Sequence, residues 1–98
     1  MEMKMVMVVC DAAHEEAVLG LLEEAGVSGY THWPRVLGRG QRSEPKMDTA
    51  VWPGFNAAVA TAVDESTAGP LMEALATLNE TLGGKGLKAF CWVLDRVI

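Results

Sequence analysis

Two segments with helical periodicity, each enclosed by apolar runs, constrain the fold of this chain more than any other feature. In residues 12–26 and 64–84, apolar side chains recur three and four positions apart, as on one face of a helix. Apolar runs that contain β-branched or aromatic residues flank both segments and predict strands. These runs are residues 3–10, 28–37, 49–63 and 87–98, and the third is expected to be broken near Pro53 and Gly54. The elements are therefore expected in the order β-α-β-β-α-β.

This order of elements defines a fold class. It is typical of the ferredoxin-like fold, an α+β sandwich in which a four-stranded antiparallel sheet carries two helices on one face. A chain of 98 residues is long enough for one domain and too short for two. We therefore expect a single ferredoxin-like domain over residues 1–98.

Several residues mark the expected ends of these elements. Asp11 is a suitable N-cap for the first helix, and Gly26 is a natural stop after it. Pro70 suits the first turn of the second helix. Pro34 lacks an amide donor, so it confines the second strand to a sheet edge or a bulge.

Strands of the expected sheet are apolar on both faces, but two helices can cover only one face of a sheet. In the first strand one face carries methionines and a valine, and the other carries valines and a cysteine. The first set is Met3, Met5, Met7 and Val9, and the second is Val6, Val8 and Cys10. Because an uncovered apolar sheet face must be buried elsewhere, we expect association with further copies of the chain.

Charge is distributed unevenly along the chain. The net charge of −5 argues against broad binding to nucleic acid or anionic membranes. Residues 35–48, in contrast, hold four basic side chains and two acidic ones. The start of the chain lacks the features of a signal peptide and is too short to span a membrane. The two distant cysteines predict free thiols and a cytoplasmic protein. A locally basic loop on an acidic body suits a small anion or an acidic partner.

Two short glycine segments are candidates for an anion site. Residues 38–40 and 83–86 form two short glycine turns, each with a Gly-x-Gly, and glycine lets backbone N–H groups approach phosphate oxygens without a Cβ in the way. Arg39, Lys85 and Lys88 are placed to add charge-assisted contacts. We expect the two segments to form opposite sides of one site.

The same segments carry a family resemblance. The stretch "GYTHWPRVLGRGQ" at residues 29–41 and the stretch "GGKGLKAFCWVLDRVI" at residues 83–98 resemble motifs of the PII family of nitrogen regulatory signalling proteins. The matching positions are Gly29, Thr31, Val36, Gly38, Gly40 and Gln41, then Gly84, Gly86, Lys88, Phe90, Arg96, Val97 and Ile98. Order, spacing and length agree over the whole chain. The chain resembles a divergent member that ends at Ile98, without the arginine-bearing tail that PII proteins use on nucleotide phosphates.

The resemblance implies an oligomeric state, a ligand and a partner protein. It implies a homotrimer that binds ATP, ADP or AMP in clefts between subunits. The implied ligand-binding residues are Thr31, Gly38, Arg39, Gly40, Gln41, Gly84, Lys85, Gly86 and Lys88. It also implies that residues 38–48 are a shortened T-loop that contacts a partner protein, such as a transporter or an enzyme. The residues implied for that contact are Arg39, Arg42, Glu44 and Lys46.

Other functions remain open at this stage. A metal-responsive trimer of the CutA kind shares the expected architecture, and an intersubunit site would use His32 or Cys10, although the sequence itself shows no metal-ligand spacing. A purely structural trimer that binds one protein constitutively is a further alternative. The serines have no neighbouring histidine and aspartate arrangement, so the protein is not expected to be an enzyme.

Overall fold

The expected order of elements is confirmed in a computed structural model that describes residues 2–41 and 44–98. The elements are β1 (Met3–Asp11), the short 3-10 turn η1 (Ala12–His14), α1 (Glu15–Glu24), β2 (Thr31–Val36), β3 (Asn56–Asp64), α2 (Glu65–Thr81) and β4 (Leu87–Val93). Within the described part of the chain, no helix is both long and apolar enough to cross a membrane.

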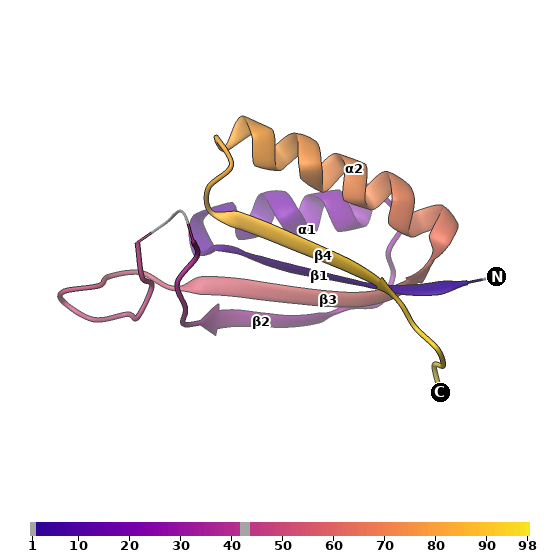
Figure 1. Ribbon diagram of the computed structural model, residues 1–98, viewed down its shortest axis with the longest axis horizontal. Coiled ribbons are helices and arrows are strands. Elements are labelled where there is room, and N and C mark those ends of the chain that lie inside the picture. Colours follow the sequence, from indigo (N-terminus) through magenta and orange to yellow (C-terminus); the bar gives the residue numbers. More distant parts are fainter. Residues whose placement is uncertain (1, 42–43) are drawn as a thin grey trace.

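The sheet has the ferredoxin-like arrangement. In the described residues it contains four strands in the order β2-β3-β1-β4, and each neighbouring pair is antiparallel. Both helices lie on the same side of this sheet, above the strands in the view of Figure 1. The fold class inferred from the sequence is therefore confirmed.

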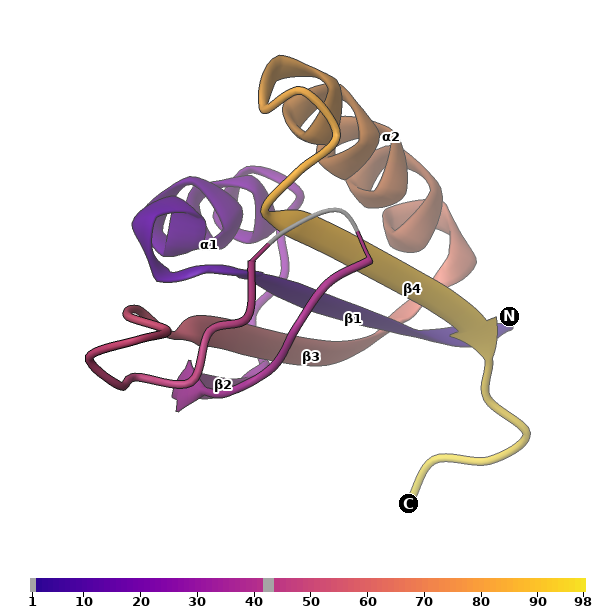
Figure 2. The same cartoon turned by 60° about the vertical axis from the view of Figure 1, so that its left-hand side comes forward.

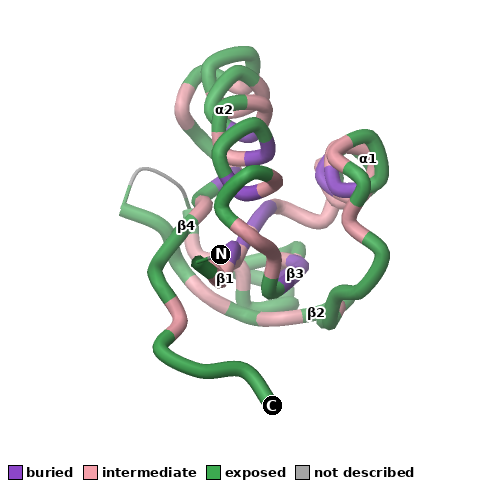
Figure 3. Tube along the Cα trace, turned by 90° about the vertical axis from the view of Figure 1, so that its right-hand side faces the viewer, coloured by how far each residue is buried: buried purple, intermediate pink, exposed green. Residues whose placement is uncertain are grey.

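Alternation along β1 places the core on the helix side of the sheet. Val6, Val8 and Cys10 are buried and face α1 and α2. Four fully buried side chains of the helices pack on these strand residues, namely Val18, Leu22, Leu71 and Leu75. Figure 3 shows this buried layer between the helices and the sheet. The two face sets expected for the first strand are thus confirmed.

Two aspartates cap helical segments, although the first caps η1 and the N-cap residue of α1 itself, His14, makes no side-chain cap bond. The Asp11 carboxylate accepts from the Ala13 amide and caps η1. The Asp64 carboxylate accepts from the Thr67 amide and caps α2. Because this cap starts α2 at Glu65, Pro70 lies inside the helix, and its expected place in the first turn was wrong. Pro70 is exposed, so water can reach the carbonyl that its missing amide leaves unpaired.

The connection between β2 and β3 is longer than expected. The strand predicted from residue 49 begins only at Asn56, so residues 37–55 leave the sheet. In Figures 1 and 2 this connection extends beyond the ends of β2 and β3. Thr49 and Trp52 instead bond to each other within a local turn, which removes them from the strand. The last strand likewise ends early, at Val93. β2 is an edge strand with a register shift between Trp33 and Val36, as Pro34 predicted.

The sheet face opposite the helices is apolar. Its centre is Met7 on β1, whose Cα partners are Ala60 on β3 and Phe90 on β4. Trp33, Phe90 and Trp92 belong to this face and are each more than 40% exposed, at 43%, 45% and 46%. Large aromatic side chains at this exposure mark a surface suited to burial against another protein.

Candidate functional site

One cavity lies where the last residues of β1 and the first residues of β4 meet the start of the 37–55 connection. It has a volume of about 500 Å³. Its walls include both glycine turns singled out in the sequence, residues 38–40 and, of the turn at 83–86, all but Gly83, together with Gln41, Leu87 and Lys88. Segments more than forty positions apart are thus brought to one place, because β2 pairs with β3, β3 with β1 and β1 with β4. The volume is in the range of ordinary small-molecule sites.

The structure brings together nearly all of the residues predicted to bind a ligand. Of the nine, eight line the cavity, which are Gly38, Arg39, Gly40, Gln41, Gly84, Lys85, Gly86 and Lys88. Thr31 does not line it, because it starts β2 at the far end of that strand from Val36. The predicted pairing of the two glycine segments is therefore present within one chain.

The residues predicted to contact a partner are separated by the structure. Arg39 belongs to the cavity wall, and Glu44 is exposed. Lys46 points back to the body of the protein, where its Nζ lies 3.1 Å from Asp11 Oδ2. Arg42 lies outside the described residues.

Backbone geometry explains why glycine occupies the 83–86 turn. Gly83, Gly84 and Gly86 have φ of 72°, 75° and 82°, in the left-handed region that other residues rarely adopt. At Gly86 a Cβ would also meet the His14 ring at 3.2 Å. The His14 ring therefore packs directly on the backbone of this cavity wall.

Asp11 is a cavity residue that sequence reasoning assigned only to helix capping. One carboxylate oxygen accepts from the Ala13 amide at 2.9 Å, and the other pairs with Lys46. The Ala13 hydrogen bond, followed by Lys46, holds the pKa of Asp11 below its ordinary value. Asn56 and Val9 also line the cavity without having been predicted. Their contribution depends on strand register, for which a single sequence gives no local signal.

Cys10 lines the cavity as a thiol, not as a thiolate. Burial, with the charges of Glu15 and Asp11, raises its pKa to about 11. Because the thiolate is the reactive form, we expect one fast-reacting thiol per chain with a disulfide reagent at pH 8, namely the exposed Cys91. A Cys91→Ser variant should then release almost no chromophore at early times. Fast reaction in that variant would contradict the burial of Cys10.

The histidines do not assemble into a metal centre. His32 Nε2 lies 3.3 Å from Glu15 Oε1, and His14 packs on Gly86. In the parts of the chain that the structure describes, no group of three or more His, Cys, Asp or Glu residues is placed to hold a metal ion. A metal-responsive function therefore gains no support from the geometry of one chain.

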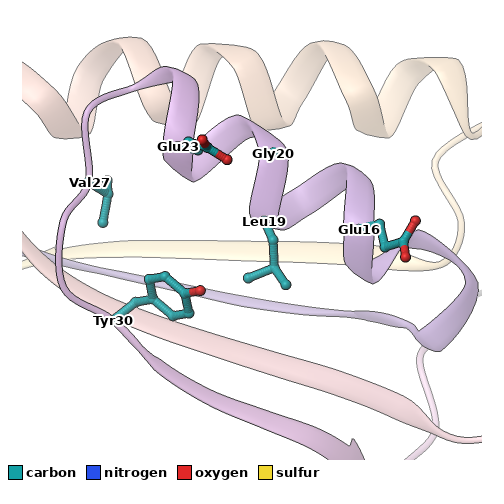
Figure 4. A pocket seen from close by; sticks show the side chains of 6 residues that line it. All are labelled: Glu16, Leu19, Gly20, Glu23, Val27 and Tyr30. Carbon is teal, nitrogen blue, oxygen red and sulfur yellow. The ribbon is translucent and has the colours of Figure 1, made fainter.

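A second groove lies between α1 and the segment that leads into β2. It has a volume of about 360 Å³ and is lined by Glu16, Leu19, Gly20, Glu23, Val27 and Tyr30. Figure 4 shows the two carboxylates on the helix above an apolar floor. The charges at this groove are negative, so it is not suited to the anion that the sequence predicts.

The fold and the cavity together define a class of protein. The ferredoxin-like sheet, with a loop from β2 and a glycine turn before β4 at one cavity, is the arrangement that the resemblance to PII proteins leads us to expect. The chain belongs to the nitrogen regulatory protein P-II family, whose family model matches residues 3–98. The resemblance seen in the sequence is thereby confirmed.

Solved structures agree on the fold. CPII, a nitrogen regulatory PII-like protein from Thiomonas intermedia K12 bound to ADP, AMP and bicarbonate, matches with a TM-score of 0.71 and 23% identity, over 98% of this chain and 91% of CPII. A PII-like signaling protein from Thermus thermophilus matches with a TM-score of 0.68 and 22% identity, over 95% of this chain and 87% of that one. A comparison with curated proteins found no significant match.

Proposed function

We propose that this protein is a non-enzymatic PII-like regulator that binds an adenine nucleotide in the cavity between its glycine segments. The observation that carries this proposal is the convergence of both segments with Arg39, Lys85 and Lys88 on one cavity. Backbone N–H groups of glycine segments and these cationic side chains are a suitable set of donors for phosphate oxygens. The ligands of CPII, which are ADP, AMP and bicarbonate, support an anionic ligand of this class.

The protein is proposed to act as a homotrimer. Support comes from the apolar face around Met7, which the helices leave uncovered. Burial of this face against two further copies removes its aromatic side chains from water. In the proposed trimer a neighbouring copy would complete the nucleotide site at the end of the sheet, as the PII resemblance implies.

The 37–55 connection is proposed to be the T-loop that contacts a partner protein. Its tip is a hydrogen-bonded turn, in which the Thr49 amide donates to the Trp52 carbonyl at 3.0 Å and the Trp52 amide donates to Thr49 Oγ1 at 3.0 Å. The tip exposes Val51 at 75% and Trp52 at 40%. Tryptophan on a pre-organised turn is a frequent anchor of protein interfaces.

Isothermal titration calorimetry with AMP, ADP and ATP tests the nucleotide site. We expect saturable heat for the wild type and weaker binding for Lys85→Gln and Lys88→Gln. The loss of one hydrogen bond to a charged group is worth roughly 1.5–3 kcal/mol, or about tenfold to a hundredfold in affinity.

Lys4→Gln is the matched control for these variants. Lys4 carries the same charge, but it lies near the start of β1, whereas the cavity begins at Val9. Its affinity for the nucleotides should equal that of the wild type. Absence of heat from any nucleotide at millimolar concentration would overturn the proposed ligand.

A further inference from the structure

Lys46 joins the second half of the 37–55 connection to the cavity wall. Lys46 pairs through its backbone with Gly38, a cavity residue, with N···O distances of 2.9 and 2.6 Å. Its side chain reaches Asp11, a second cavity residue, at 3.1 Å. Lys46 is thus attached to the cavity wall at two points, although it lies in the loop.

The other side of Lys46 supports the loop tip. A Cβ at Gly54 would lie 3.5 Å from Lys46 Cδ, so the lysine chain runs beneath the residue that closes the turn. The Gly54 carbonyl accepts from the Asp48 amide at 2.9 Å. Any displacement of the Lys46 side chain therefore removes a support from the turn at residues 47–54.

An anion in the cavity would compete with Asp11 for this lysine. Asp11 and Lys46 expose only 29% and 26% of their side chains, so their pair is partly shielded from water. A phosphate group carries up to two charges and three acceptor oxygens, whereas the Asp11 carboxylate carries one charge and already bonds to Ala13. Lysine, a flexible chain with a compact charge, can change partners without movement of its backbone.

We propose that Lys46 exchanges the Asp11 carboxylate for the phosphate of a bound ligand, and that this exchange loosens the turn at residues 47–54, which then stays joined to β2 only through the pair of Asp48 with Arg35 among the described side-chain pairs. The proposal rests on the proposed nucleotide site and names its means of control over the loop. By thermodynamic linkage, a ligand that releases the loop must bind more tightly when the loop is already released.

Two variants separate this exchange from a merely structural role. Asp11→Asn keeps the helix cap, because asparagine caps as well as aspartate, but it loses the charge that holds Lys46. Lys46→Met keeps the aliphatic chain and loses the charge. Both should free the loop without ligand. Their effects on ADP affinity should be opposite, with a gain of roughly fivefold or more for Asp11→Asn and a loss for Lys46→Met.

Hydrogen–deuterium exchange of the trimer supplies the loop readout. The reporting amides are those of Asp48 and Thr49, which donate to backbone carbonyls within the turn, whereas the Lys46 amide, bonded to Gly38, should keep its slow exchange. We expect ADP, and pyrophosphate as a probe without adenine, to speed their exchange in the wild type. Both variants should show the fast exchange already without ligand, and neither should respond further.

Asp64→Asn is the matched control, because Asp64 caps α2 in the same way and its carboxylate accepts only from Ser66 and Thr67 among the described residues. Its loop exchange and ADP affinity should be those of the wild type. Unchanged loop exchange in Asp11→Asn would overturn the proposal, whether or not nucleotide binds. Affinity changes of the same sign in Asp11→Asn and Lys46→Met would overturn it as well. Absence of any anion binding to the wild type would instead overturn the nucleotide site, and with it the ligand's part in the exchange.

Discussion

A Met7→Glu variant is expected to be a folded monomer of about 10.5 kDa, whereas the wild type is expected to sediment as a trimer. Met7 lies at the centre of the uncovered face, between Ala60 and Phe90. In a trimer built on that face, the substitution brings one glutamate from each copy into a site without water. Desolvation of each ion costs several kcal/mol, so association should weaken by roughly a thousandfold or more.

The monomer should retain its fold, because Met7 points away from the core formed by Val6 and Val8. Circular dichroism checks the fold, and analytical ultracentrifugation at micromolar concentration checks the mass. Val51→Glu is the control, since it places the same charge on the exposed loop tip and should leave the trimer intact. A Met7→Glu protein that keeps the mass of the wild type would contradict a trimer built on this face. If neighbouring copies complete the nucleotide site, the monomer also loses ADP binding, although Met7 does not line the cavity.

Element order was predictable from the sequence because it depends on periodicity, which is a local property. The alternation of Val6, Val8 and Cys10 with the methionines identified both faces of β1. The capping role of Asp11 and the edge position of β2 also follow from local chemistry, whereas the cap at Asp64 was not predicted.

The start of β3 could not be read in the same way. Residues 49–55 contain valine, tryptophan and phenylalanine, which favour strands, but the local turn between Thr49 and Trp52 and contacts from outside the segment determine their conformation. Asp48 adopts a φ of 55° and pairs with Arg35, whose guanidinium lies 4.3 Å from the centre of the Phe55 ring. These contacts join the two ends of the connection across the sheet edge and keep it out of the ladder.

The candidate site likewise combines motifs that were visible in the sequence with contacts that were not. The glycine segments were visible as motifs, and the structure brought them together. The second function of Asp11 was not visible, because nothing near Asp11 in the sequence indicates a partner at Lys46. A residue that acts through tertiary pairing is found only when the register of β1 against β4 and the path of the loop are known.

Gly86→Ala is expected to lose both stability and nucleotide affinity. At a φ of 82° an alanine costs about 1–2 kcal/mol, and its Cβ would meet the His14 ring at 3.2 Å, which adds about 1 kcal/mol of overpacking. Because Gly86 forms the cavity wall, ADP affinity should fall at least roughly tenfold, equivalent to about 1.4 kcal/mol. Urea unfolding and calorimetry measure the two effects.

Gly83→Ala separates backbone strain from the contact with His14. Gly83 has a φ of 72°, but a Cβ there would meet nothing within 4 Å, and Gly83 does not line the cavity. It should lose only the backbone contribution of about 1–2 kcal/mol and keep its ADP affinity. Addition of His14→Ala to Gly86→Ala should then recover part of the stability, because the crowded ring is removed. Equal losses in the two glycine variants would show that the His14 ring moves aside without cost, and unchanged ADP affinity in Gly86→Ala would exclude this wall from the nucleotide site.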